Sequence, residues 1–226
     1  MTEHLTTRRS YDAVAAAYAA EIGDELRRKP LDRALLDMIS ELAAGGSVLD
    51  LGCGPGHVAS HIAERSRVLG VDLSEVMAAQ ALRVRRVPAC AGDLTALPIR
   101  TGSVAAIICL YVIIHLDDQD RDAAYRELAR ILQPGGYALI GFHVRDADHE
   151  VGEVITHREW WGRPVELIFR FLDPETEISG LSGAGFELVA RIDRAPYPGV
   201  EYPSQRCYLL MRRLVRTQRR SSTAEF

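Results

Sequence analysis

The sequence predicts a single α/β domain with a mostly parallel β-sheet and helices on both faces. Short apolar runs rich in valine, isoleucine and leucine alternate with helical stretches along the chain, which is typical of strands joined by crossover helices. The runs are apolar on both faces, as strands buried between two helix layers are. A length of 226 residues, 47% of them hydrophobic, suits one large domain.

Seven strands are expected, and the last of them is antiparallel. The parallel part consists of five apolar runs, at residues 47–51, 68–72, 89–91, 104–110 and 137–143. Two more runs, 186–194 and 205–212, are joined by a proline-rich loop. This loop is too short for a crossover helix, so the two strands must pair antiparallel.

Polar residues mark where the helices between these strands begin. Three capping positions are expected, at Ser74, at Asp117 or Asp118, and at Asp173. Gly185 stands where a left-handed residue would end the helix that begins after Asp173.

Two segments lie outside the alternation and are candidates for a lid. The first is a helical region from Ser10 to Ala43 with a break at Gly23 and Pro30, and the second is the aromatic stretch 150–172. The expected organisation is an N-terminal helical lid (1–44), an α/β core (45–212) with a substrate insertion at about 146–172, and a basic flexible tail (213–226).

Charge and cysteine content exclude several classes of protein. A net charge of −4 gives no reason to expect nucleic acid or a membrane surface as the main partner. The basic tail could touch RNA or lipid, but a solvated chain end explains it better. The four cysteines are widely spaced and fit reduced thiols, and no apolar run is long enough to cross a membrane. We therefore expect a cytoplasmic protein.

A glycine-rich turn follows the first expected strand. Gly52, Gly54 and Gly56 alternate with other residues just before a helix, and glycine lets a ligand approach the backbone closely. A turn with nothing bound is the alternative interpretation. Asp72, however, lies 20 residues after Gly52 at the end of the next strand, where a carboxylate can accept hydrogen bonds from both ribose hydroxyls. A nucleoside cofactor is therefore expected.

The acid just before this turn narrows the choice of cofactor. A dinucleotide site usually shows Gly-x-Gly-x-x-Gly and leaves the helix N-terminus clear for a pyrophosphate. Asp50 would repel phosphate, whereas it would suit an ammonium group and a sulfonium. This charge pattern favours S-adenosylmethionine.

Three ordered motifs carry a resemblance to a known family. They are Val48-Leu-Asp-Leu-Gly-Cys-Gly-Pro-Gly56, Leu69-Gly-Val-Asp-Leu-Ser74 and Ala91-Gly-Asp-Leu-Thr-Ala-Leu-Pro98. From Tyr11 to about Arg212 the chain resembles the class I S-adenosylmethionine-dependent methyltransferases. The resemblance implies a Rossmann-like fold, S-adenosylmethionine as cofactor and S-adenosylhomocysteine as product. Ala105 departs from the family, which commonly has an acid there, at a structural position.

The motifs and the resemblance together imply a set of cofactor-binding residues. The set is Tyr11, Tyr18, Asp50, Gly52, Cys53, Gly54, Gly56, Asp72, Leu73, Met77, Asp93, Leu94, Leu110 and Tyr111. In it Asp72 holds the ribose, Asp93 accepts from the adenine amino group, and Leu110 and Tyr111 border the sulfonium. Cys53 is expected to pack beside the cofactor rather than act as a nucleophile.

Two histidines are the candidate catalytic residues. His115 follows the fourth strand and His143 ends the fifth, at the edge where open α/β sheets bind ligands. Each is either a base or substrate anchor, or a structural histidine. A mainly apolar acceptor pocket with few charges is expected from Tyr111, His115, His143, Trp160, Trp161, Phe169 and Phe171. The two tryptophans could instead be the core of the lid.

The expected function is methyl transfer to an O, N or C atom of a small molecule, with alignment of the reactants as the main source of catalysis. No metal is expected, since Asp117, Asp118 and Asp120 fit helix capping. Two alternatives stay open, an RNA methyltransferase and a non-catalytic cofactor-binding protein of the same fold. No nucleic acid or membrane partner is expected, and the protein is expected to be a monomer or homodimer.

Overall fold

A seven-stranded sheet forms the centre of the computed structural model, which describes residues 3–215. Its strands are β1 (Ser47–Leu51), β2 (Arg67–Asp72), β3 (Ala89–Ala91), β4 (Val104–Leu110), β5 (Leu132–Arg145), β8 (Phe186–Arg194) and β9 (Gln205–Arg213). They lie in the order β3-β2-β1-β4-β5-β9-β8. The first five are parallel, and β9 is antiparallel to both of its neighbours. The predicted fold class is confirmed, and β5 is longer than predicted at both ends.

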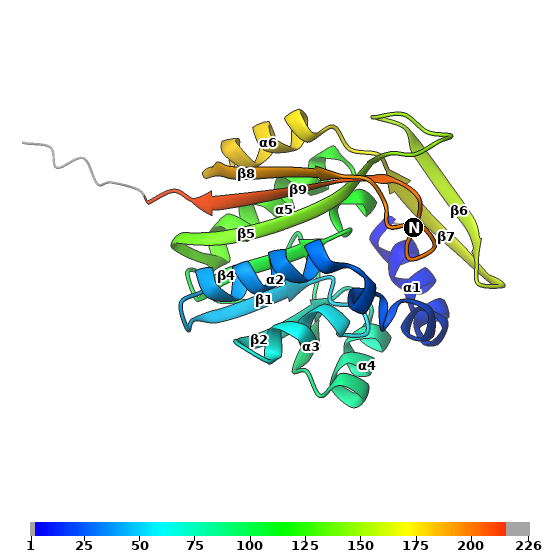
Figure 1. Cartoon of the computed structure of the whole chain (residues 1–226), viewed down its shortest axis with the longest axis horizontal. Helices are drawn as coiled ribbons and strands as arrows, with labels where there is room; N and C mark the ends of the chain where they lie inside the picture. The colour runs from blue at the N-terminus through cyan, green and yellow to red at the C-terminus, as the bar shows by residue number, and fades with distance from the viewer. Residues whose placement is uncertain (1–2, 216–226) are drawn as a thin grey trace, which may run out of the picture.

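Helices cover both faces of the sheet (Figure 1). One face packs on α2 (Pro30–Leu42) and α3 (His57–Ala63), with α4 (Glu75–Arg85) beside α3. The other face packs on α5 (Asp118–Ile131) and α6 (Pro174–Gly183). The described part of the chain also forms two short 3₁₀ helices, η1 (Glu25–Arg28) and η2 (Ile113–His115). In residues 3–215 we find no helix that is both long and apolar enough to cross a membrane.

The predicted helix caps are formed by side chains. Ser74 accepts a hydrogen bond from the Met77 amide at 3.0 Å, and Asp173 accepts from the Thr176 amide at 3.0 Å. Of the two candidates before α5, Asp117 is the cap. Each bond satisfies an amide that a helix N-terminus leaves without a partner.

The N-terminal region consists of two helices that pack in different places. Helix α1 (Glu3–Ile22) begins earlier than the predicted Ser10, since polar side chains of its first turns bind the core. Pro30 starts α2, where its missing amide costs nothing. Helix α2 packs into the core, so only α1 lies over the carboxyl edge of the parallel strands. Of the segment 1–44, which was expected to be a lid, α1 is therefore the helix placed over this edge.

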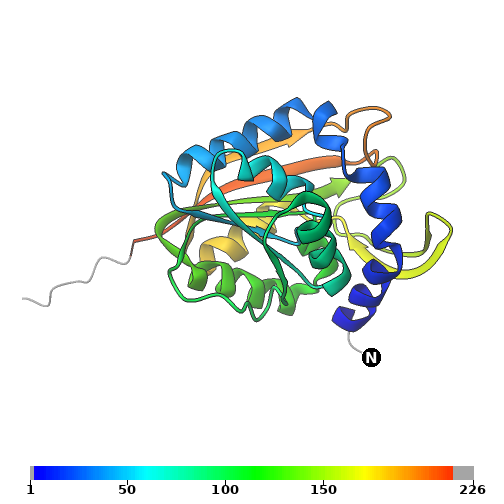
Figure 2. The same ribbon diagram turned by 90° about the horizontal axis from the view of Figure 1, so that it is seen from below.

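The aromatic insertion folds as a hairpin of β6 (Val154–Trp160) and β7 (Arg163–Arg170), separate from the main sheet. Figures 1 and 2 show this hairpin and α1 at the same end of the molecule. The two segments pack together through Val14, Val165 and Leu167. The backbone amide of Glu166 also donates to the Ser10 hydroxyl at 2.9 Å. Of the predicted tail, Arg216, Arg219 and Arg220 lie outside the described residues.

Candidate active site

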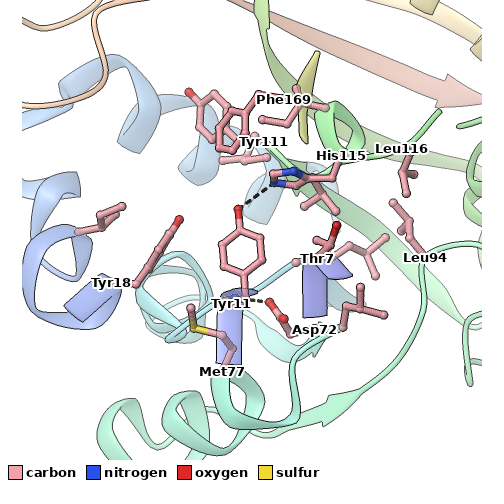
Figure 3. A pocket seen from close by; sticks show the side chains of 18 of the residues that line it. Thr7, Tyr11, Tyr18, Asp72, Met77, Leu94, Tyr111, His115, Leu116 and Phe169 are labelled. Carbon is pink, nitrogen blue, oxygen red and sulfur yellow. Dashed lines mark hydrogen bonds between the residues drawn. The ribbon is translucent and has the colours of Figure 1, made fainter. Parts of the chain in front are cut away.

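A cavity of about 370 Å³ lies under α1 at the carboxyl edge of the parallel strands (Figure 3). Its volume is in the range of small-molecule sites. Most of the predicted site residues line it, namely Tyr11, Tyr18, Gly52, Gly54, Asp72, Leu73, Met77, Asp93, Leu94, Leu110, Tyr111, His115 and His143. The structure therefore brings together residues from α1, β2, α4, β4 and β5 and from the turns that follow β1, β3 and β4.

The glycine turn and Asp72 form one unit. Gly52 and Gly54 have positive φ angles of 67° and 52°, which glycine adopts without strain. The Asp72 carboxylate accepts from the amides of Gly54 and Ser74, each at 2.8 Å. Burial raises the pKa of Asp72 to about 6, although these two amides oppose the shift. Asp72 thus faces the cavity as a carboxylate near neutral pH.

Three predicted cofactor residues do not line the cavity. Gly56 serves helix packing, because a Cβ on it would lie 2.8 Å from the Ala81 Cβ. Cys53 is buried against Gly70. Asp50 is 3% exposed and accepts from the backbone of Ala59 in α3, and its Oδ2 has no partner among the described residues. Burial, with the Asp72 charge nearby, raises the pKa of Asp50 to about 8.

The apolar end of the cavity is closed by a histidine that the sequence did not indicate. Leu94, Leu97 and Leu116 line this end. Asp93 bonds to Thr95 and, at 2.7 Å, to His4 Nδ1. The other ring nitrogen of His4 lies 2.9 Å from Asp120 Oδ2. Helix α1 is therefore fastened directly over Asp93.

Tyr111 and His143 form a stacked pair above the turn. Tyr111 has a positive φ of 61°, a strained conformation that tends to occur at functional sites. Its ring lies 4.9 Å from that of His143, and its hydroxyl is 2.6 Å from the Tyr208 hydroxyl. His143 Nδ1 bonds to Ser204 at 2.6 Å. Burial and the charge of Arg206 hold the pKa of His143 well below 6.5, so this ring is neutral.

His115 is fixed in one tautomer. Its Nδ1 lies 2.8 Å from the Ile168 carbonyl oxygen, which can only accept, so Nδ1 carries the proton. Its Nε2 therefore accepts from the Tyr11 hydroxyl at 2.8 Å (Figure 3). Burial lowers the pKa of His115 to about 4. The ring is neutral at physiological pH, and its lone pair is already bonded.

The hairpin supplies part of the predicted aromatic pocket. Trp160 and Phe169 line the cavity. Trp161 and Phe171 do not line it; Trp161 stacks on Trp160 at 4.5 Å and Phe171 stacks on His149 at 5.2 Å.

The expectation that few charges line the pocket is wrong. Glu25, Lys29, Glu201 and Arg206 all line the cavity. Lys29 is 2% exposed and lies 2.8 Å from Glu25 and 2.9 Å from Glu201. The contact with Glu201 joins segments far apart in sequence. One sequence signal could have marked Lys29 as a site residue, because it is the only lysine of the chain.

These residues fit a nucleoside that carries a charged end. Asp72 offers carboxylate oxygens for ribose hydroxyls, and the leucines beside Asp93 offer an apolar surface for a base. Two acids and two bases stand elsewhere on the wall, so a zwitterionic group finds partners of both signs.

Comparison with known proteins identifies the family. Residues 48–136 match the methyltransferase domain model. A malonyl-[acyl-carrier protein] O-methyltransferase of Methylovorus sp. is 30% identical over 217 residues, which cover 89% of this chain and 68% of that protein. Mouse tRNA (carboxymethyluridine(34)-5-O)-methyltransferase ALKBH8 is 34% identical over 58% of this chain. This chain spans only 18% of the mouse protein.

Solved structures show the same fold. The DhpI complex with S-adenosylhomocysteine superposes with a TM-score of 0.70 and 22% identity, over 94% of this chain and 98% of that chain. An S-adenosylmethionine-dependent methyltransferase of Methanosarcina mazei superposes with a TM-score of 0.67 and 16% identity, over 75% and 93%. The sequence match extends over most of the chain, and a cavity lined by Asp72 lies where the family's cofactor is expected. The protein therefore belongs to the class I S-adenosylmethionine-dependent methyltransferases.

Proposed function

We propose that this methyltransferase acts on a small molecule with an apolar body, held between Tyr111, His143 and the hairpin. The bound cofactor supplies a methyl group on a sulfonium, which is already an activated donor. The observation that carries the proposal is that aromatic residues from β5, from β6–β7 and from the turn after β4 line the same cavity as Asp72. Helix α1 packs on β7 over this cavity, an arrangement that suits an enclosed acceptor.

The charges on the wall support a small acceptor over RNA. Beside the Tyr111 ring, the lining base Arg206 lies 3.3 Å from the lining acid Glu201, so its charge is balanced. RNA binding draws on an excess of basic groups that neutralise phosphates. RNA is the second candidate because a relative is named as a tRNA methyltransferase.

The low pKa of His115 and its bond to Tyr11 indicate which chemical group the acceptor presents. With a pKa of about 4 the ring holds a proton poorly, and Tyr11 occupies its lone pair. Such a group is a weak base for an alcohol, whose proton is far less acidic. A carboxylate, ionised at neutral pH, needs no base. Two relatives are named for acceptors that contain a carboxyl group, malonyl and carboxymethyluridine. We therefore propose a carboxylate acceptor, with His115 as the residue that positions Tyr11.

Matched acceptors test both parts of the proposal. The protein is incubated with tritium-labelled S-adenosylmethionine and phenylacetate, phenylethanol, phenethylamine, malonyl-pantetheine or total tRNA. We expect transfer to a carboxylate, recognised because a methyl ester releases labelled methanol in alkali whereas an ether or a methylamine does not. Transfer to tRNA alone would overturn the small-molecule proposal. Transfer to phenylethanol but to neither carboxylate would overturn the choice of acceptor group.

A further inference from the structure

One wall of the cavity carries a cluster of three residues, of which the predicted cofactor set included only Tyr18. Tyr18 lies near the end of α1, Glu25 in the following turn and Lys29 just before α2. All three line the cavity. The cluster adjoins the glycine turn, because a Cβ on Gly54 would lie 3.8 Å from the Tyr18 ring.

The glycine turn itself offers no free hydrogen-bond donor. The amides of Gly52 and Cys53 donate to the Val71 carbonyl at 2.7 and 3.1 Å. The Gly54 amide donates to Asp72 and the Gly56 amide to the Cys53 carbonyl, each within 2.9 Å. The residue between them is Pro55, which has no amide hydrogen. The turn therefore leaves room for a ligand but cannot hold a charged carboxylate.

The acid before the turn does not face the ligand either. Asp50 bonds to the backbone of α3 and does not line the cavity. The ammonium partner expected from the sequence must therefore be another acid.

The cluster has the unused donors and acceptors that an amino-acid group requires. The Lys29 ammonium has three N–H donors, of which Glu25 and Glu201 use two. Glu25 Oε1 has one ion-pair neighbour among the described residues, His57 Nε2 at 3.6 Å. The Tyr18 hydroxyl has no hydrogen-bond partner among the described residues. The Tyr18 ring packs against other aromatic rings, and burial raises the pKa of its hydroxyl.

Glu25 and Lys29 both carry their charge at neutral pH. Burial alone would raise the pKa of Glu25, but His57 and Lys29 outweigh it and the pKa is lowered. Burial alone would lower the pKa of Lys29, but Glu25 and other neighbours outweigh it and the pKa is raised. An anion and a cation thus stand side by side on the wall, with the geometry of a site for a zwitterion.

We infer that Glu25, Lys29 and Tyr18 bind the amino-acid end of S-adenosylmethionine. Glu25 accepts from the ammonium, Lys29 donates to the carboxylate, and the Tyr18 hydroxyl completes the carboxylate site. The inference rests on the family's cofactor and assigns to this cluster the role that the sequence pattern gave to Asp50. Charge-assisted hydrogen bonds of this kind contribute about 1.5–3 kcal/mol each, which corresponds to roughly 10- to 150-fold in affinity.

Ligands that lack parts of the amino-acid group test the inference by calorimetry. Methylthioadenosine lacks the whole group, and decarboxylated S-adenosylmethionine lacks only the carboxylate. For Lys29→Met we expect roughly 10- to 150-fold weaker binding of S-adenosylhomocysteine and S-adenosylmethionine, with methylthioadenosine and the decarboxylated ligand within about threefold of wild type. Glu25→Gln should weaken every ligand that has the ammonium. Tyr18→Phe should weaken only ligands that have the carboxylate.

Exposed residues of the same region provide matched controls. Glu21→Gln and Arg27→Met change charge at positions that are exposed and outside the cavity lining, so they should leave all affinities unchanged. Methylthioadenosine binding reports whether each variant is folded. If Lys29→Met loses even that ligand, Glu25→Gln and Tyr18→Phe, which keep the contact between Lys29 and Glu201, decide the matter.

The outcomes separate this inference from the assignment of the cofactor. Wild-type preference for S-adenosylhomocysteine over methylthioadenosine that persists in all folded variants would overturn the inference and leave the cofactor in place. The absence of any such preference in the wild type would overturn it as well. Failure of the wild type to bind any of these nucleosides would instead contradict the cofactor.

Discussion

Asp50→Asn changes how the stability of the protein depends on pH. Asp50 is 3% exposed, one of its oxygens has no partner among the described residues, and burial raises its pKa from 3.8 to about 8. In the unfolded chain the same carboxyl ionises at its ordinary pKa. The folded state therefore binds this proton more tightly, and wild-type stability is lost as the pH rises from the unfolded pKa through the folded one.

The size of the effect follows from the two pKa values. Between the unfolded and the folded pKa, each rise of one pH unit lowers the free energy of unfolding by about 1.4 kcal/mol through this single group. From about pH 5.5 to about pH 7.5 the loss is therefore about 2.5 kcal/mol. Asparagine cannot ionise, so Asp50→Asn lacks this part of the pH dependence while every other titrating group stays the same.

Urea unfolding of both proteins at a series of pH values measures this difference. We expect the stability of the wild type relative to Asp50→Asn to fall by the amount above, and the exposed Asp148→Asn to run parallel to the wild type. Affinity for S-adenosylhomocysteine at neutral pH should stay within about threefold of wild type, because Asp50 does not line the cavity. Parallel stability curves, or a large loss of affinity with the fold intact, would refute the placement of Asp50.

Three further predictions concern the cavity and helix α1, which lies over it. Since burial raises the pKa of Asp72 to about 6, S-adenosylhomocysteine should bind about tenfold more weakly at pH 5 than at pH 7, and a flat calorimetric profile would contradict the ribose role. Burial alone would lower the pKa of His4, but Asp93 and Asp120 outweigh it, so protonated His4 holds α1 on the core and this contribution is lost as the pH rises through the raised pKa. Hydrogen exchange in α1, corrected for intrinsic rates, should therefore accelerate above neutral pH in the wild type and not in His4→Gln. With a methylated acceptor in hand, Tyr11→Phe, His115→Ala and the double variant should lose similar turnover, as expected of one coupled unit, whereas a 10²–10⁴-fold loss confined to His115→Ala would indicate a general base.

Most of the fold could be predicted from the sequence, because the patterns that mark its strands and helix starts are local. Apolar runs marked the strands, and Ser74, Asp117 and Asp173 marked helix starts through bonds that span only three residues. The length of β5 was underestimated, because Pro134 and Gly135 at its start are poor indicators of a strand.

The wall of the cavity could not be predicted, because its contacts join distant segments. His4 meets Asp93 across 89 residues, and Lys29 meets Glu201 across the whole domain. Neither pair has a spacing that a local pattern could detect.

The direction of Asp50, in contrast, was available from the sequence. Side chains alternate between the two faces of a strand, so Asp50 shares a face with Val48 rather than with Leu49 and Leu51. Val48 packs with α2 and α3, which is where Asp50 points.

Helix α1, the candidate lid, bonds to the core through His4 near its start and lines the cavity with Tyr18 near its end. Within α1 only Ser10, Val14 and Ala15 are buried, and Val14 packs with Tyr11 on the hairpin. His4 fastens the start of the helix to Asp93 and Asp120, beside the apolar end of the cavity. Tyr18, near the other end of the helix, faces the cluster of Glu25 and Lys29. A ligand that spans the cavity therefore touches α1 near both ends, so we expect binding of S-adenosylhomocysteine to protect α1 from hydrogen exchange.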